Sequence, residues 1–231
     1  MGHSTRSLPL VWKLYRAGLR TGIVVPYSLE AFFLPEIPPH IPLFFLEGYS
    51  IHYGSSEHSF AATSPHWGVI KSLIKQIPDI VKTIRSERKW MKEMSKEGRV
   101  GLVISDSRFG LWSNHFPSVY ITHQLNPQPP YLAFPWNKWA LTMLHQQIWS
   151  RYTQCWVPDW KGDNNLSGEL SLWEHPDRRV HFIGPLSRFE FLYHQESLLN
   201  DKKVGAETDR FAEFIQKYEF DVLAAISGPE P

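Results

Sequence analysis

The stretch from Val100 to Arg108 decides the fold: it reads VGLVISDSR, an apolar run of strand length that ends abruptly in polar residues. A second run of this kind, Val119–Thr122, follows after the short segment Phe109–Trp112. Short apolar runs bounded in this way are typical of buried parallel strands. Five further runs lie on either side, at Ile23–Val25, Leu43–Leu46, Cys155–Val157, Val180–Ile183 and Val222–Ile226.

Segments with helical spacing separate these runs. Helices are predicted over Ser4–Ala17, Ser64–Gly98, Trp136–Tyr152 and Asp209–Tyr218. Gly18 suits the left-handed position that ends the first helix, and Pro78 is expected to kink the second. The alternation of strands and helices predicts an α/β fold, a Rossmann-like parallel sheet with helices on both faces.

No apolar run precedes the first helix, because the chain opens with Gly2-His3-Ser4-Thr5-Arg6. In a doubly wound fold the strand before the first glycine-rich turn normally lies in the middle of the sheet. We therefore expect the first strand to be missing. The sheet should then have an empty slot between Ile23–Val25 and Val100–Ile104, or these strands should pair directly. The polar segment Asn200–Thr208 is interpreted as a linker, and Val222–Ile226 as a strand of whatever follows.

Composition excludes several classes of protein. The 231 residues carry 24 Lys and Arg against 23 Asp and Glu, so no broad basic field exists to bind nucleic acid. A single cysteine, Cys155, cannot form an internal disulfide, and Met1–Arg6 contains no apolar segment of a signal peptide. No apolar run reaches the roughly 18 residues of a membrane-spanning helix. We expect a cytoplasmic protein that touches a membrane without crossing it.

Polar residues that follow the strands are the candidates for a site, because ligands of open α/β sheets bind at the carboxyl ends of the strands. The backbone N–H groups of Ser4–Arg6 could hold a phosphate, or Ser4 could simply cap the helix. Asp106 could take a proton or bind a hydroxyl group, or it could cap the following turn. His123 could act as a base or donor near neutral pH, or as a structural hydrogen-bonding group.

Two further residue types have open interpretations. None of the 11 histidines stands in a metal-binding frame, so no metal is implied, and Cys155 is interpreted as a buried, inert thiol. The aromatic segment Tyr131–Tyr152 could contact a bilayer interface or pack in the core. We predict that Trp136 and Trp139 are partly exposed. Buried positions are predicted at Leu141, Leu144 and Ile148.

Seven segments together resemble the loops of a known family. They are Gly2–Arg6, Ser105–Leu111, Ile121–Leu125, Cys155–Asp159, Gly162–Gly168, Ile183–Phe189 and Ser227–Pro231. In sequence and spacing they resemble bacterial GT-B-type glycosyltransferases and, more distantly, the peptidoglycan lipid-intermediate N-acetylglucosaminyltransferase. That relative has a Gly-Gly-His loop, of which Gly2-His3 matches the end. Its His-Glu-Gln-Asn segment is matched in part by His123-Gln124-Leu125-Asn126.

The resemblance implies a two-domain enzyme that transfers a sugar. Residues 1–199 would form the acceptor-binding domain without its first strand, 200–220 a linker and helix, and 221–231 the start of the nucleotide-sugar-binding domain. The implied reaction is metal-independent and needs no cofactor. A hexose such as N-acetylglucosamine would pass from a UDP-sugar to a lipid-linked or glycan acceptor, at the inner face of the plasma membrane.

The resemblance also assigns roles to individual residues. His3 and Asp106 would be catalytic, because either could assist deprotonation of the acceptor hydroxyl. Acceptor-binding residues would be Gly2, Ser4, Thr5, Arg6, Arg108, His123, Gln124 and Asn126. Nucleotide-sugar-binding residues would be Arg188, Ser227 and Gly228. The chain by itself is expected to show no transfer.

Two alternative functions stay open. A nucleotide-sugar epimerase would use the same two-domain architecture, and it would need a pair of carboxylates in the cleft. A non-catalytic module would bind a glycan or a lipid headgroup with the same loops and transfer nothing.

Overall fold

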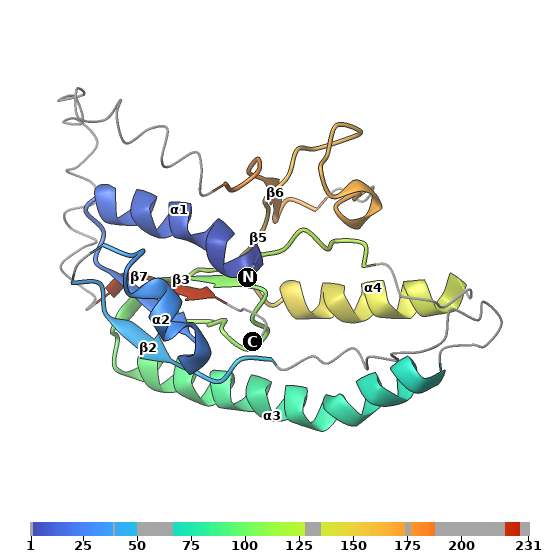
Figure 1. Ribbon diagram of the computed structural model, residues 1–231, viewed down its shortest axis with the longest axis horizontal. Coiled ribbons are helices and arrows are strands. Elements are labelled where there is room, and N and C mark those ends of the chain that lie inside the picture. Colours follow the sequence, from blue (N-terminus) through green and yellow to red (C-terminus); the bar gives the residue numbers. More distant parts are fainter. Residues whose placement is uncertain are drawn as a thin grey trace.

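The computed structural model describes residues 2–38, 40–49, 67–127, 135–173, 177–187 and 220–226, which form a seven-stranded, all-parallel sheet (Figure 1). The strands are β1 (Thr21–Val25), β2 (Leu43–Phe45), β3 (Val100–Asp106), β4 (Ser118–Ile121), β5 (Gln154–Val157), β6 (Val180–Phe182) and β7 (Phe220–Ile226). Their order across the sheet is β2-β1-β7-β3-β4-β5-β6. The predicted parallel α/β fold is confirmed.

Helices cover both faces of the sheet. They are α1 (Gly2–Arg16), α2 (Glu30–Phe33), α3 (Trp67–Lys96) and α4 (Pro135–Trp149), with short 3-10 turns η1 (Tyr27–Leu29) and η2 (Gly168–Leu170). Three predicted helices are confirmed, and the fourth, 209–218, lies outside the described residues. Gly18, with φ of 77°, follows α1 in the left-handed region as predicted. Helix α2 was not predicted from the sequence.

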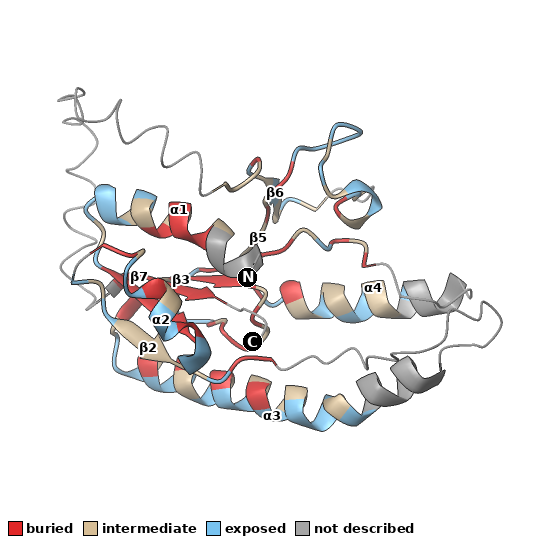
Figure 2. Cartoon of the chain, in the orientation of Figure 1, coloured by how far each residue is buried: buried red, intermediate tan, exposed pale blue. Residues whose placement is uncertain are grey.

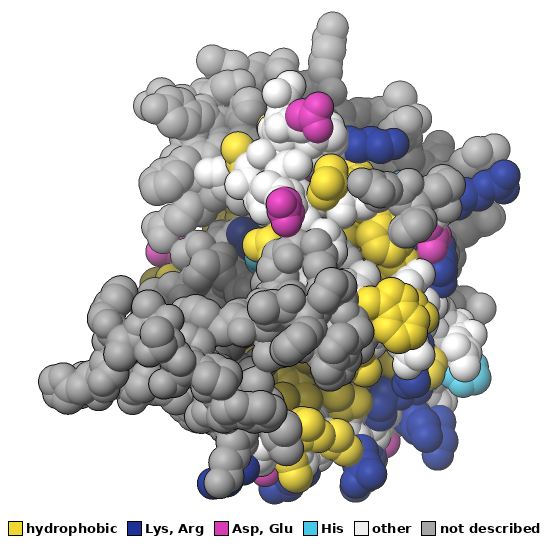
Figure 3. Space-filling view, turned by 90° about the vertical axis from the view of Figure 1, so that its right-hand side faces the viewer, with side chains coloured by type: hydrophobic (Ala, Val, Ile, Leu, Met, Phe, Trp, Pro, Cys, Tyr) yellow, Lys and Arg dark blue, Asp and Glu magenta, His cyan; other side chains and the backbone are white. Residues whose placement is uncertain are grey.

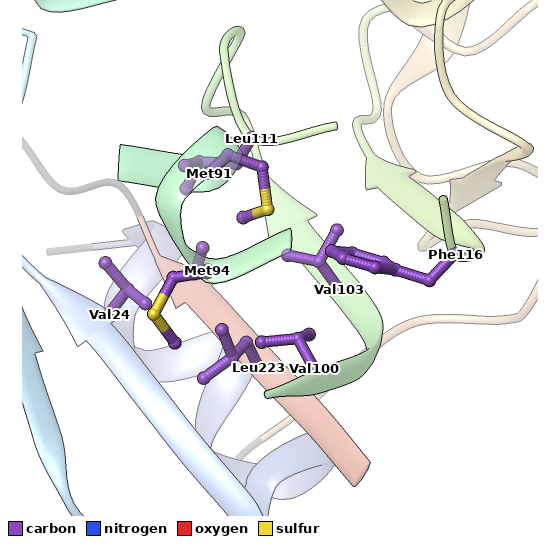
Figure 4. Close-up of a cluster of buried hydrophobic side chains, with 9 residues drawn as sticks. Val24, Met91, Met94, Val100, Val103, Leu111, Phe116 and Leu223 are labelled. Carbon is purple, nitrogen blue, oxygen red and sulfur yellow. The ribbon is translucent and has the colours of Figure 1, made fainter. Parts of the chain in front are cut away.

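The alternation of side chains along β3 assigns each helix to a face. Ile104 packs with Leu10 and Leu14 of α1, whereas Val103 packs with Met91 and Met94 of α3. Figure 4 shows the α3 cluster, in which Val24 of β1 and Leu223 of β7 join these methionines. In Figure 1 the sheet lies between α1 above and α3 below. The central strands β1, β7 and β3 therefore supply core residues to both layers.

Strand β7 lies in the middle of the sheet, between β1 and β3. Ala224 is paired with Ile23 on one side and with Ile104 on the other. Both expected arrangements, an empty slot and direct pairing of β1 with β3, are therefore wrong. The segment Val222–Ile226, which was expected to belong to a following domain, is a strand of this sheet. An unfilled slot would leave buried backbone groups unpaired at about 1–3 kcal/mol each, and β7 satisfies both rows.

An ion pair fixes β7 at its amino-terminal end. Asp221 is buried and accepts hydrogen bonds from the backbone N–H of Arg20 at 2.8 Å and from its Nη2 at 3.0 Å. Arg20 immediately precedes β1, so the contact joins two neighbouring strands where both begin. A one-residue slip of β7 would break it and would move Leu223 to the opposite face.

The central strands are buried, the edge strands β2 and β6 are less so, and the helices are buried only toward the sheet (Figure 2). Helix α4 departs from the expected pattern. Trp139 is 66% exposed as predicted, but Leu144 is 57% exposed and was predicted to be buried. Leu141 and Ile148 were also predicted to be buried and are half-buried, because among the described α4 side chains Trp149 is the most deeply buried. No described helix is long and apolar enough to span a membrane.

Candidate functional site

Four polar side chains meet at the carboxyl ends of β3 and β4. Arg6 and Ser7 come from α1, Asp106 ends β3, and His123 follows β4 by two residues. We call Arg6, Ser7, Asp106 and His123 the carboxyl-edge cluster. Asp106 is on the α1 side of β3 because it shares a face with Ile104. Of the five residues that the sequence predicts to converge on one cleft, His3, Asp106, Arg108, His123 and Asn126, the structure joins Asp106 and His123 through their shared contact with Arg6.

Asp106 anchors the carboxyl-edge cluster. Its carboxylate is 2% exposed and forms a two-point ion pair with Arg6, in which Nε donates to Oδ2 at 3.0 Å and Nη2 donates to Oδ1. The Ser7 hydroxyl also donates to Oδ2, at 2.7 Å, and that of Ser107 donates to Oδ1, at 3.3 Å. With its oxygens engaged in this way, Asp106 orients the Arg6 guanidinium.

The contact between Arg6 and His123 fixes the state of the imidazole. Arg6 Nη1 lies 2.9 Å from His123 Nδ1, and a guanidinium only donates hydrogen bonds, so Nδ1 must accept. The neutral ring then carries its proton on Nε2. In this tautomer Nε2 carries the ring N–H, and Arg6, 14% exposed, adds a positive charge. The pair is suited to hold an oxygen of a hydroxyl or an anionic group.

Arg108 is not part of the carboxyl-edge cluster, although the sequence grouped it there. Its guanidinium is fully buried on the α3 side, where Nε donates to Glu87 Oε1 at 2.7 Å and Nη2 donates to the Glu47 carbonyl at 2.5 Å. Residues two apart in an extended strand share a face, but Ser107 adopts φ of 55° and turns the chain. Asp106 and Arg108 consequently serve opposite layers.

The surroundings of Arg108 form a sealed network. Glu87 Oε2 accepts from the Tyr49 hydroxyl at 2.5 Å and from the backbone N–H of Gly110 at 2.7 Å. Burial, and then the charge of Glu87, raises the pKa of Tyr49 far above its ordinary value. A Cβ on Gly110 would lie 2.6 Å from Glu87 Cβ and 2.7 Å from the Ile84 carbonyl, so only glycine allows this approach. We call Tyr49, Glu87, Arg108 and Gly110 the sealed network.

Backbone hydrogen bonds fix the loop that follows β4 and carries His123, Gln124 and Asn126. Gln124 donates its backbone N–H to the Thr122 hydroxyl at 3.0 Å, and Asn126 donates its backbone N–H to the Leu170 carbonyl at 2.9 Å. Neither interaction uses the Gln124 side chain. The Asn126 side chain donates to the Glu169 carbonyl at 3.2 Å. Asn126 therefore joins this loop to η2.

His145 of α4 supports the same loop. Its Nε2 lies 3.4 Å from the Tyr120 hydroxyl on β4. Burial lowers the pKa of His145 to about 4, against an opposing hydrogen bond to the Gln124 backbone, and nearby His123 adds to the lowering. A neutral His145 thus lies beneath the loop that carries His123.

Asp159, at the end of β5, organises the next loop. It accepts backbone N–H groups of Trp160 and Leu166 at 2.8 and 2.7 Å, and the Ser171 hydroxyl at 2.9 Å. Burial would raise the pKa of Asp159, but the hydrogen bonds from Leu166, Ser167 and Ser171 outweigh it and lower the pKa to about 2. Asp159 is buried, and the role of this carboxylate is to close the loop.

Several predicted site residues have no described side chain. Gly2, His3, Ser4 and Thr5 belong to the first turns of α1, and only their backbone is described. Because α1 already begins at Gly2, Ser4 lies inside the helix and does not cap it. Residue 3 precedes Arg6 and Ser7 by one helical turn. Arg188, Ser227 and Gly228 lie outside the described residues.

Sequence reasoning missed three residues of these two groups. Ser7, Glu87 and Tyr49 were not singled out, although the Ser7 and Tyr49 hydroxyls donate short hydrogen bonds to carboxylates and Glu87 accepts one from the Arg108 guanidinium. Glu87 did carry a signal, since it lies four residues before Met91 on the apolar stripe of α3. A charged residue on a buried helix face requires a partner.

Metal binding and thiol chemistry were also considered for the described part of the chain. Within it, no group of three or more His, Cys, Asp or Glu side chains is arranged to hold a metal ion. Cys155 is buried as predicted, and burial raises the pKa of its thiol to about 12, which keeps it protonated. Comparisons of the chain with protein-family models, curated proteins and solved structures give no match in any of the three.

Proposed function

We propose that this chain forms the acceptor-binding part of a metal-independent glycosyltransferase. The enzyme would move a hexose such as N-acetylglucosamine from a UDP-sugar to a lipid-linked or glycan acceptor. The observation that carries the proposal is the carboxyl-edge cluster. It presents a guanidinium and an imidazole N–H at the edge of a parallel sheet where ligands of such folds bind.

In the proposed reaction the acceptor hydroxyl attacks the anomeric carbon of the sugar. Its oxygen forms the new bond to that carbon, the bond from the carbon to the UDP phosphate oxygen breaks, and UDP departs as an anion. His3 takes the hydroxyl proton, as a residue placed one helical turn before Arg6. Arg6 and His123 position the acceptor, and Asp106 keeps Arg6 in place.

Asp106 was expected to be an alternative catalytic base to His3, and its hydrogen bonds favour a different role. A carboxylate that already accepts four hydrogen bonds, two of them from a guanidinium, is a weak proton acceptor. We therefore assign the base to His3 and treat Asp106 as a positioning residue. An epimerase would need a pair of carboxylates beside its substrate. Only Asp106 stands in the carboxyl-edge cluster, which supports transfer over epimerisation.

The test is an assay of the full-length gene product with radiolabelled UDP-sugars and a membrane extract. A labelled lipid or glycan supports the proposal, an epimerised nucleotide-sugar supports the alternative enzyme, and neither product indicates a binding module. In the expected case Arg6→Gln and His3→Ala each lower transfer by about 10²-fold or more. The matched control is Arg20→Gln, which breaks another arginine–aspartate pair at the opposite edge and should leave transfer unchanged.

A peripheral contact with the inner face of the plasma membrane is part of the proposal. Helix α4 exposes Trp139, Met143 and Leu144, apolar side chains that could enter a bilayer interface. Figure 3 shows the end of the molecule at which α4 begins, where Lys and Arg side chains gather at the bottom near hydrophobic ones. The bottom of this view is the level of α3, on which Lys82 and Arg85 are exposed.

Flotation with anionic liposomes tests this contact. Trp139→Ser should reduce the bound fraction several-fold. Trp160→Ser is the matched control, because Trp160 is similarly exposed but belongs to the loop that follows β5. Equal flotation of both variants and the wild type would count against a role for α4.

A further inference from the structure

A hollow of about 450 Å³ lies at the edge of the sheet opposite the carboxyl-edge cluster. Its lining comes from two segments, Ser113–Pro117 and Arg151–Thr153. The first directly precedes β4 and the second directly precedes β5, so the hollow is at the amino-terminal ends of these parallel strands. We call it the amino-edge hollow. It is shallow and wide open to solvent.

Positive charge is concentrated beside the amino-edge hollow. The Arg151 guanidinium carbon lies 5.6 Å from the ring centroid of Trp112, and that of Arg88 lies 3.5 Å from the same centroid. Burial, and also the charge of Arg151, lowers the pKa of Arg88. Among the described residues neither arginine forms an ion pair with a carboxylate. Two cations thus share one aromatic ring without a neutralising partner.

The hydrogen bonds of the two arginines differ. Arg88 donates to the backbone carbonyl of Trp112, so its guanidinium is engaged within the protein. Arg151 is exposed and lines the hollow, and in the described part of the chain its guanidinium has no hydrogen-bond acceptor. Arg151 is therefore the cation available to a ligand, and Trp112 restricts its orientation.

The hydroxyl groups of the hollow also differ in what they can offer. Thr153 Oγ1 accepts the backbone N–H of Ser118 at 3.0 Å, which leaves its hydrogen for another acceptor. Ser113 Oγ is already engaged, since it accepts the backbone N–H of His115 at 3.1 Å and pairs with Ser95 at 3.2 Å. The donors that line the hollow are thus Arg151, Thr153, His115 and Asn114, around a floor of buried Tyr152 and Phe116.

We propose that the amino-edge hollow binds a small organic phosphate, with the phosphate on Arg151 and Thr153 and the organic part beside Asn114 and His115, which are exposed and line the hollow. A phosphate suits the site because it carries more negative charge than a carboxylate and offers more acceptor oxygens to the surrounding donors. This site is separate from the carboxyl-edge cluster and does not depend on the proposed transferase activity.

A purely structural role of Arg151 gives a different expectation. Arg151 follows the carboxyl end of α4, where its backbone N–H donates to the Ile148 carbonyl at 3.3 Å. A cation near that end also stabilises the helix dipole. If this is its only role, Arg151→Gln will lower the melting temperature without altering phosphate binding.

The experiment is a titration of the chain with inorganic phosphate and with glucose 6-phosphate, followed by NMR chemical shifts. We expect glucose 6-phosphate to bind more tightly than inorganic phosphate, with shifts at Arg151 and Thr153. Arg151→Gln should weaken binding of both probes about tenfold or more. Arg151→Lys, which keeps the charge and loses the planar fork, should weaken it less. Arg85→Gln, at an exposed arginine of α3, is the matched control and should change nothing.

The outcomes separate clearly. Binding that falls in Arg151→Gln and persists in Arg85→Gln supports the site. The proposal is overturned if the wild-type chain binds neither probe. It is also overturned if Arg151→Gln and the wild type bind with equal affinity, whatever the melting temperature, or if Arg85→Gln weakens binding as much.

Discussion

Two arginine–carboxylate pairs stand at the end of β3, and they differ in what surrounds them. In the sealed network, Arg108 and Glu87 are 0% and 1% exposed, and protein groups occupy their hydrogen-bonding positions. In the carboxyl-edge cluster Asp106 is equally buried, but Arg6 is 14% exposed and its third contact is an imidazole. One pair is closed on all sides, whereas the other presents a cation and a ring N–H at the sheet edge.

The comparison teaches that burial of the acidic partner does not identify a functional site. A buried pair with every hydrogen bond satisfied holds elements together, here α3 and the segment after β3. An arginine that is partly exposed to solvent can bind a ligand while its ion pair with the buried carboxylate stays intact. The open partner, Arg6, is therefore the better indicator of function than Asp106.

The largest effect is expected from opening the sealed network. Arg108→Ala leaves Glu87 buried without its cation, which should lower the free energy of unfolding by about 3–5 kcal/mol. Urea denaturation followed by tryptophan fluorescence measures the loss. The double variant Arg108→Met with Glu87→Leu should recover part of it, because no unpaired charge is left. A loss below about 1 kcal/mol for Arg108→Ala would mean that water reaches Glu87.

The next effect concerns packing around the same network. Gly110→Ala places a methyl group within 3.0 Å of Glu87 Cβ and the Ile84 carbonyl, so α3 must move away from the loop. We expect a loss of about 1–3 kcal/mol in the free energy of unfolding, the usual cost of overpacking. Gly98→Ala is a useful contrast, because nothing lies within 4 Å of its Cβ and only its φ of 63° is unfavourable. A loss for Gly110→Ala no larger than that for Gly98→Ala would show that α3 and the loop move apart at little cost.

Opening the carboxyl-edge cluster should cost less stability. Arg6→Gln removes charged hydrogen bonds from Asp106, while those from Ser7 and Ser107 persist, so we expect a loss of about 1–2 kcal/mol in the same denaturation assay. We expect the opposite order for function. Arg6→Gln should lower sugar transfer by a much larger factor than its small loss in the free energy of unfolding would suggest. A loss equal to that of Arg108→Ala would place Arg6 with the structural pairs.

The smallest effect is a pH dependence under the His123 loop. The pKa of His145 falls from 6.5 to about 4 on folding, so between these values the unfolded chain binds more protons. The contribution of His145 to the free energy of unfolding is therefore fully present above pH 6.5 and decreases as the pH is lowered toward 4. Between pH 6.5 and 5 the free energy of unfolding of His145→Gln should therefore fall by about 1 kcal/mol less than that of the wild type. His181→Gln, an exposed histidine on β6, is the control and should keep the wild-type pH profile.

The sequence by itself determined the layers of this protein. Apolar runs such as Val100–Ile104 form buried parallel strands because a strand covered on both faces must be apolar throughout. The long stripe between residues 64 and 98 forms α3 because its apolar side chains repeat at helical spacing. Polar residues at strand ends also placed Asp106 and His123 at one edge, since parallel strands end together.

Only the tertiary structure decided which strand fills the middle of the sheet and which arginine joins the site. The apolar pattern of Val222–Ile226 fits any central position, and its place between β1 and β3 depends on backbone pairing across long sequence distances. Likewise Asp106 and Arg108 look like neighbours on one strand face, until the left-handed turn at Ser107 separates them. Such choices depend on contacts between distant segments, which local periodicity does not encode.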